Sequence, residues 1–340
     1  MLKKRKSGVE CLRLLIMFGI VISHWGGHGN ASVSSNYDNV LNLIWMQLSQ
    51  YFGEVANFAF VLISGYFSSS RTTVNIKGIR NIVIDVKFYS LLMFIIAVIF
   101  GKQILSIKTG ILALFPIVFS QYWFVIPFLF VCLIGPWLND IVRKLDTKGI
   151  IYFYGLQFIA ILLLPIIGNA SVASNITLFI FYYSIGAGLS IHKEKFRFIE
   201  RNKYMLALMG FFSAIFLCYA IDYIGNLLIY NRLIGRFSPF PLMTALGLLY
   251  IFLKFDFSSG VVNKLALSTF SVYLISENAN IYPWLWKDYF DNAAYVASPY
   301  LIPISLLHCL VVFVACILID QVYRLLRNLL ETRVFLNGKK

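Results

Sequence analysis

Apolar residues fill long windows that repeat from one end of the chain to the other. These windows lie at residues 9–28, 41–67, 82–101, 122–138, 150–168, 176–191, 204–224, 238–254, 265–286 and 299–319. A helix rises about 1.5 Å per residue and needs roughly 20 mostly apolar residues to cross the hydrocarbon of a bilayer. The pattern therefore predicts an all-α integral membrane protein, a single bundle of about ten transmembrane helices.

Composition agrees with a chain surrounded by lipid. Of the 340 residues, 59% are hydrophobic and 13% are charged, whereas a soluble domain carries roughly 25% charged residues because its surface faces water. No segment is rich enough in Pro, Gly or Ser to be an interdomain linker. We therefore expect residues 1–340 to form one transmembrane domain with no appended soluble domain.

The cysteines and the net charge argue against two other classes, a protein held by disulfides or zinc and a nucleic-acid-binding protein. The five cysteines all fall in apolar windows and lack the paired spacings of a disulfide framework or a zinc site, so we expect no metal. The net charge of +14 comes from basic residues in short loops between apolar segments, not from one continuous basic face. Membrane lipid is therefore the expected surrounding, and nucleic acid is not an expected partner.

The loops also predict an orientation. If the N-terminus lies inside, 22 of the 29 Lys and Arg residues fall in cytoplasmic segments and five fall in external ones. Cytoplasmic loops of membrane proteins carry an excess of Lys and Arg. Both termini are therefore predicted to be cytoplasmic, with residues 29–40 outside.

Three ionisable residues lie in the first window, where each costs about 2.5–3.5 kcal/mol on insertion scales. Glu10 and Arg13 are three residues apart and can pair on one helix face. Both lie near the inner boundary, so a function for Glu10 and simple snorkelling toward the headgroups remain equally open. His24 lies about 16 Å further along the helix and only about 20° from Arg13 in helical phase. A histidine near a helix end is often only interfacial, but this alignment favours a catalytic role.

Two further residues bear on this site. Glu54 lies in the second window with polar neighbours at helical spacing, which favours a cavity lining over a cluster that only joins helices. His28, one turn beyond His24, is expected in the external interface and outside the site.

Glu10-Cys11-Leu12-Arg13, followed by His24, is the first of several short motifs along the chain. In order, they resemble those of acyltransferase family 3, which consists of membrane-embedded acyltransferases. In that family an acidic residue precedes Leu-Arg, and ten residues separate an Arg or Lys from a His, as they separate Arg13 from His24 here. The other resembling segments are Phe60–Tyr66, Tyr122-Trp123-Phe124 with Pro136, Phe237-Ser238-Pro239-Phe240, and Ser268–Ile275. One departure follows the last segment, where many members have His-Glu-Asn and this chain has Ser276-Glu277-Asn278.

The resemblance also implies a donor site. The family often has a basic-x-x-basic motif in the loop before the third span, assigned to the phosphates of acyl-CoA, and Lys77 and Arg80 match it with Arg71 as a third contact. The chemistry is sound, because cations three apart share a helix face and a helix start offers free N–H groups to an anion. Ordinary cytoplasmic positive charge remains an equally open interpretation.

The resemblance implies an O-acyltransferase that moves an acyl group, most simply acetyl, from acyl-CoA to a hydroxyl of a cell-envelope carbohydrate or lipid-linked glycan, and the residues add an Arg and a His on one helix face. Histidine suits the task because its imidazole exchanges protons near neutral pH; the sequence leaves open whether His24 is base or nucleophile. Catalytic candidates are His24, Arg13, Glu10 and Glu54. The resemblance implies a multi-pass protein of a bacterial cell (plasma) membrane. A carrier or flippase for a lipid-linked glycan is the alternative, although no internal repeat typical of carriers is present.

Overall fold

The computed structural model describes residues 6–32, 37, 39–167, 174–224 and 235–337, and in these ranges the protein is helical without strands. The longer helices are α1 (Ser7–His28), α2 (Val40–Ser68), α3 (Ile76–Ile99), α5 (Val125–Lys144), α6 (Thr147–Phe158), α8 (Asn175–Ile191), α10 (Lys203–Ile224), α12 (Pro239–Leu253) and α16 (Leu301–Asn337). The shorter ones are α4 (Ile107–Leu114), α7 (Leu164–Ile167), α9 (Arg197–Arg201), α13 (Gly260–Leu265), α14 (Thr269–Ser276) and α15 (Tyr282–Trp284). This confirms the predicted all-α class.

Five helices of the described chain are long and apolar enough to cross a membrane: α1, α3, α5, Lys203–Ala220 of α10 and Leu301–Leu329 of α16. Shorter apolar helices cover Thr147–Leu163, Asn175–Ile191, Pro239–Leu253 and Gly260–Ser276. Helix α2 is longer than these but buries polar residues, among them Gln47 and Asn57. The protein is therefore a membrane protein by length and composition of its helices.

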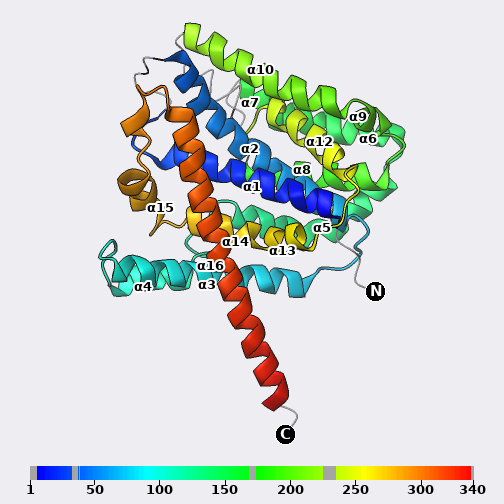
Figure 1. Ribbon diagram of the computed structural model, residues 1–340. Helices are drawn as coiled ribbons and strands as arrows, with labels where there is room; N and C mark the ends of the chain where they lie inside the picture. The colour runs from blue at the N-terminus through cyan, green and yellow to red at the C-terminus, as the bar shows by residue number, and fades with distance from the viewer. Residues whose placement is uncertain (1–5, 33–36, 38, 168–173, 225–234, 338–340) are drawn as a thin grey trace.

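Helices α1, α2, α8, α10 and α12 lie together as one group, with α5 and α14 on one side of it (Figure 1). Helix α2 contacts both α1 and α8. Helices α2 and α8 cross closely because each of them has a glycine at the crossing. A Cβ on Gly65 would meet the carbonyl of Tyr183, and one on Gly186 would meet the carbonyl of Leu62. Glycines at this crossing let two backbones touch, as is common between membrane helices.

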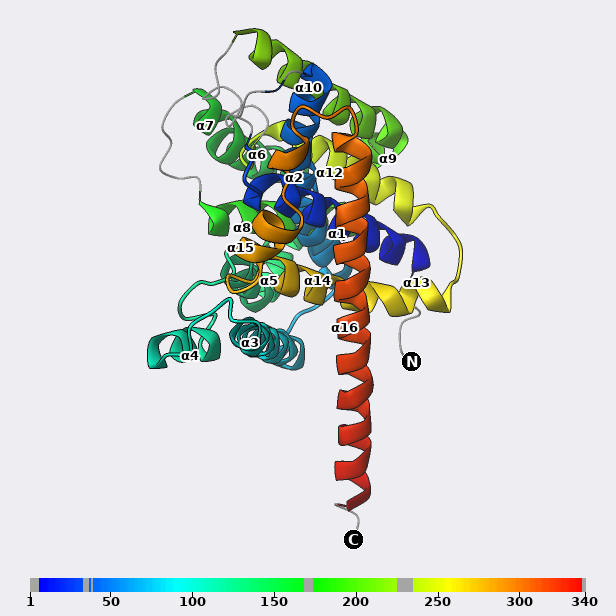
Figure 2. The same cartoon turned by 60° about the vertical axis from the view of Figure 1, so that its left-hand side comes forward.

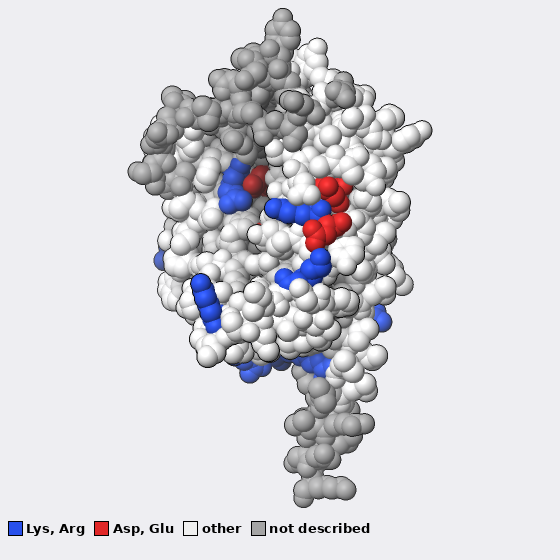
Figure 3. All heavy atoms as spheres, turned by 90° about the vertical axis from the view of Figure 1, so that its left-hand side faces the viewer, with Lys and Arg blue, Asp and Glu red and all other residues white. Residues whose placement is uncertain are grey.

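Helix α16 crosses the other helices obliquely, and its C-terminal part extends beyond α3 (Figures 1 and 2). The face that carries α4 and α15 shows charged side chains only in small groups, with uncharged surface between them (Figure 3).

Three predicted boundaries were wrong, and a fourth window is helical but irregular. The window 265–286 is not one helix, because α14 ends at Ser276. The last helix does not stop at residue 319 but continues to Asn337. Helix α5 runs through Pro136 to Lys144. The window 150–168 contains a π-helical turn, Ile159–Leu163, just before Pro165, which has no N–H to donate one turn back.

Candidate active site

The end of α14 meets the outer part of α1 at His24. Glu277, the first residue after α14, places its Oε2 atom 2.9 Å from Nε2 of His24. Ser276, the last residue of α14, places its Oγ 3.0 Å from Nδ1 of the same ring. His24 is 7% exposed, so both contacts are made inside the protein. Histidine, serine and glutamate thus form one buried cluster between two helices distant in sequence.

The hydrogen bonds of Ser276 determine the tautomer of His24. The hydroxyl of Ser276 donates to the carbonyl of Val272 at 2.8 Å, so its oxygen accepts the Nδ1–H of His24. Nε2 is then the nitrogen that gains or loses a proton. Because Nε2 lies against a carboxylate oxygen, a proton lies between His24 and Glu277 in this arrangement. Ser276, where the family often has histidine, is therefore an orienting residue here.

His28 belongs to this cluster, and the prediction that placed it outside the site was wrong. Its Nε2 lies 2.8 Å from the same Oε2 atom of Glu277, and its ring stacks on Tyr282 with 4.2 Å between centroids. One carboxylate thus serves two imidazoles, whose centroids are 5.5 Å apart. The error came from helical phase, which considers only α1 and ignores the chain that packs over its end.

The same three residues are the ones that could hold a metal ion. Single ligand atoms of His24, His28 and Glu277 lie within 4.8 Å of one another. Two imidazoles and a carboxylate are ligands that zinc accepts. The hydrogen bonds among the three account for the arrangement without an ion.

Glu54 lines the same cavity but has a different partner. Its carboxylate faces Nε of Arg236 at 3.3 Å, and the Arg236 guanidinium lies over the ring of Trp123 with 3.7 Å to the centroid. Arg236 also donates to Asn175 at 2.9 Å. Sequence reasoning counted Arg236 only as an external loop charge and so missed it as part of the site.

Three cavities follow one another through the helices and share walls. They are the Arg71 cavity of about 250 Å³, the central cavity of about 280 Å³ and the His24 cavity of about 190 Å³. Arg13 and Ser64 line both the Arg71 cavity and the central cavity. Asn57 and Tyr273 line both the central cavity and the His24 cavity. His24, His28, Glu54, Arg236 and Glu277 all line the His24 cavity.

Arg13 and His24 are on one face of α1, but they line different cavities. The guanidinium of Arg13 bonds to Glu10 at 3.2 Å, as their spacing predicted. Glu10 is 5% exposed, which favours burial in protein over snorkelling to headgroups. Arg13 therefore borders the central cavity and the Arg71 cavity, and its hydrogen bond to Glu10 holds it in place.

The three predicted donor-binding residues separate into two groups. Arg71 lines the cavity named after it, together with Asn75 and Gly78 at the start of α3. The side chain of Asn75 caps this helix by accepting from the N–H of Gly78 at 3.1 Å. Lys77 and Arg80 are exposed on the first turns of α3 and do not line the cavity. The geometry thus brings Arg71 and a helix N-terminus together, with the other two cations beside them.

A buried carboxylate near the central cavity was not predicted. Asp320 is fully buried and accepts from Tyr89 at 2.6 Å, from Ser271 at 2.6 Å and from Nε of Arg324 at 2.5 Å. These contacts tie α16 to α3 and α14. Arg324 in turn lines the central cavity, so that two arginines, Arg13 and Arg324, border it.

Comparison with known proteins assigns the chain to a family. The family model described as an acyltransferase domain matches residues 6–320, nearly the whole chain. Helices suited to a bilayer and this match together define a membrane acyltransferase. The chain belongs to acyltransferase family 3, as its motifs indicated. Neither the curated proteins nor the solved structures gave a match to it.

Proposed function

We propose that this protein is an O-acyltransferase that moves an acyl group, most simply acetyl, from acyl-CoA to a hydroxyl of a bacterial cell-envelope carbohydrate. One observation carries the proposal: adjoining cavities lead from cationic residues, Arg71 and Arg13, to the buried pair His24–Glu277. The cations suit the phosphates of CoA, and the pair suits proton transfer at the acceptor hydroxyl. A donor that stretches through these cavities would meet an acceptor at His24.

Proton transfer is the role proposed for His24. In the reacting state the acceptor hydroxyl replaces the Glu277 oxygen at Nε2 of His24, because Nδ1 donates its proton to Ser276. The hydroxyl attacks the thioester carbonyl as its proton passes to Nε2. Glu277 then resumes its contact with Nε2, at 2.9 Å, and stabilises the imidazolium that has formed. The departing CoA thiolate then takes the proton back. The observed contact matches the state in which His24 holds that proton.

Donor binding is assigned to the Arg71 cavity. The start of α3 offers backbone N–H groups, and Arg71 offers a guanidinium fork to phosphate oxygens. Lys77 and Arg80 add positive charge beside it. The distance from Arg13 to His24 along α1, about 16 Å at 1.5 Å per residue, is comparable to the reach of a pantetheine arm.

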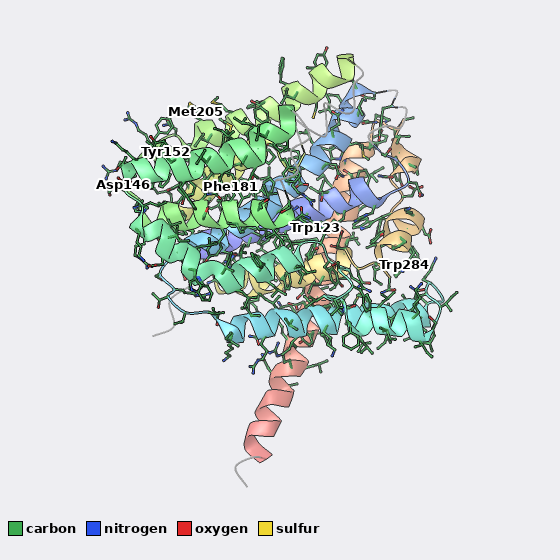
Figure 4. All side chains as sticks on the ribbon, turned by 180° about the vertical axis from the view of Figure 1, so that it is seen from behind. Trp123, Asp146, Tyr152, Phe181, Met205 and Trp284 are labelled. Atoms are coloured by element: carbon green, nitrogen blue, oxygen red, sulfur yellow. The ribbon has the colours of Figure 1, made fainter. Side chains whose placement is uncertain are left out.

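The proposed topology has about ten membrane-crossing segments in one domain, with both termini in the cytoplasm and the protein in the plasma membrane. Asp146, in a loop expected inside, and Trp284, in a segment expected outside, lie at opposite ends of the bundle (Figure 4). A reporter fused after Lys340 should be active only in a cytoplasmic form. Activity of a reporter that works only outside the cell would overturn this topology.

The decisive experiment is incubation of the purified protein in detergent with radiolabelled acetyl-CoA and an envelope glycan. We expect label in the glycan, or slow thioester hydrolysis in its absence, and loss of both in His24→Ala. A protein that cleaves no thioester but moves a labelled lipid-linked glycan across vesicles would favour the carrier alternative.

A further inference from the structure

Tyr273 stands between the central cavity and the His24 cavity and lines both of them. Its side chain comes from α14, is 3% exposed, and its ring centroid lies 6.2 Å from that of His24. The hydroxyl proton of Tyr273 has no acceptor among the described residues, although the backbone N–H of Phe124 lies beside the hydroxyl oxygen. A buried hydroxyl proton without an acceptor is costly and calls for an explanation.

An unpaired hydroxyl alone does not indicate function, as Tyr182 shows. Its hydroxyl is also buried without a partner, but Tyr182 stacks on Phe58 in the core and lines none of the three cavities. What distinguishes Tyr273 is its place where the two cavities adjoin.

Asn57 of α2 lines the same two cavities. It is 7% exposed, and its side-chain amide makes no hydrogen bond within the described part of the chain. The third residue common to both cavities, Ile20, is apolar. A phenol and an amide, neither with an acceptor for its protons among the described residues, therefore belong to the two polar residues that border both cavities, where a thioester in the central cavity would meet an acceptor beside His24.

We propose that Tyr273 and Asn57 donate hydrogen bonds to the thioester carbonyl oxygen and stabilise the oxyanion of the transition state. This assignment rests on the proposed acyl transfer. The acceptor oxygen bonds to the carbonyl carbon and gives its proton to Nε2 of His24, while the carbonyl electron pair moves onto the oxygen between the two donors. When the intermediate collapses, the C–S bond breaks and the thiolate takes the proton from His24. The two donors need no rearrangement, because no other group occupies them.

Tyr273→Phe tests the assignment because it removes only the hydroxyl. We expect kcat to fall roughly 10²–10³-fold, the usual effect of losing one such donor, with the KM for acyl-CoA changed less than about twofold. The apparent Tm should be unchanged or higher, since an unpaired buried polar group is removed. The matched control is Tyr182→Phe, the same change at an unpaired hydroxyl away from the cavities, which should keep wild-type kcat. Asn57→Leu supplies a second variant of similar size without donors, and its kcat should fall in the same way.

The possible outcomes distinguish the oxyanion assignment of Tyr273 and Asn57 from the proposed acyl transfer. If the wild-type protein is active and both Tyr273→Phe and Asn57→Leu keep its kcat, the oxyanion assignment is overturned and the proposed acyl transfer is unaffected. An equal fall in Tyr273→Phe and Tyr182→Phe also overturns it, since the effect would then be one of packing. Wild-type protein that neither transfers acetyl nor cleaves the thioester overturns acyl transfer and this assignment together.

Discussion

Nε2 of His24 and Oε2 of Glu277 lie 2.9 Å apart, although the two residues come from opposite ends of the chain. The contact joins α1 to the residue that follows α14 and makes one wall of the His24 cavity. With the other nitrogen held by Ser276, the carboxylate stabilises the imidazolium that forms once Nε2 has taken up a proton.

Glu277→Gln should reduce acyl transfer strongly while leaving donor affinity intact. The amide keeps the size of the side chain but cannot stabilise an imidazolium on His24 as a carboxylate does. We expect kcat to fall on the order of 10²–10⁴-fold, the range for loss of acid–base assistance, and His24→Ala to fall at least as far. Steady-state kinetics with labelled acetyl-CoA measure both. Wild-type kcat in either variant would remove the pair from the mechanism.

His28→Ala should have an intermediate effect, contrary to the expectation that it would be silent. Loss of its hydrogen bond leaves Glu277 with one imidazole instead of two. A hydrogen bond to a charged group contributes about 1.5–3 kcal/mol, so we expect kcat to fall roughly ten- to hundredfold. The control is His192→Ala, whose ring bonds to the carbonyl of Val142 away from this cavity. Equal kinetics in the two variants would return His28 to an interfacial role.

Some of this site follows from helical periodicity alone. Arg13 and His24 share one face because a single helix carries both, and a helix fixes the direction of every side chain. Glu10 and Arg13 pair for the same reason. The all-α class followed equally directly from the repeated apolar windows.

The rest depends on contacts between distant segments. Arg236 looked like a loop charge, and only packing against α2 pairs it with Glu54. Ser276 looked only like a departure from the histidine of the family, since the pattern cannot show that its oxygen faces His24. Asp320 lies one residue beyond the predicted end of the last window. The apolar pattern continues past it, and Arg324 follows four residues later, so the sequence did contain a signal for a longer helix with an Asp–Arg pair.

Donor affinity should depend more on Arg71 than on Lys77 and Arg80. Arg71 lines a cavity, where a hydrogen bond to a phosphate contributes about 1.5–3 kcal/mol, and Arg71→Ala should raise the Kd for acetyl-CoA roughly tenfold or more. The double variant Lys77→Ala/Arg80→Ala should raise it roughly two- to fivefold, since these two exposed cations do not line the cavity as Arg71 does. Isothermal titration measures both. The control is Lys144→Ala, an exposed cation paired with Asp140. A Kd unchanged in all three variants would make these residues topology signals only.

Zinc should inhibit the enzyme by binding the His24, His28 and Glu277 cluster. The proposed proton transfer uses no metal, and the three ligand atoms lie within 4.8 Å of one another, close enough to surround an ion after small shifts. Bound zinc would occupy Nε2 of His24 and so block proton transfer. We expect inhibition reversed by EDTA, and a zinc affinity at least about tenfold lower in His28→Ala. Equal zinc affinity in wild type and His28→Ala, measured by equilibrium dialysis, would contradict this.

Asp320→Asn should weaken donor binding through Arg324. The carboxylate fixes Nε of Arg324, and the same guanidinium donates to the carbonyl of Leu267 at 2.8 Å, so Arg324 is held at the wall of the central cavity. Tyr89 and Ser271 also donate hydrogen bonds to the carboxylate of Asp320, and so weaken the effect of its negative charge on Arg324. The edge of the guanidinium that faces away from Asp320 can therefore attract an anion.

Without that charge Arg324 loses its anchor, and we expect the KM for acetyl-CoA to rise while kcat changes less. Arg324→Lys should show the same rise, because an ammonium cannot bond Asp320 and Leu267 as a planar fork does. Asp320→Ala goes further, because it leaves Tyr89, Ser271 and Arg324 without their acceptor. This variant should also have a lower apparent Tm, since breaking a buried pair costs about 3–5 kcal/mol. Arg197→Ala is the control, because Arg197 is an exposed arginine that pairs with Glu194 and lines none of the three cavities. If Asp320→Asn and Arg324→Lys keep the wild-type KM and only Asp320→Ala loses stability, Asp320 joins α3, α14 and α16 and has no part in donor binding.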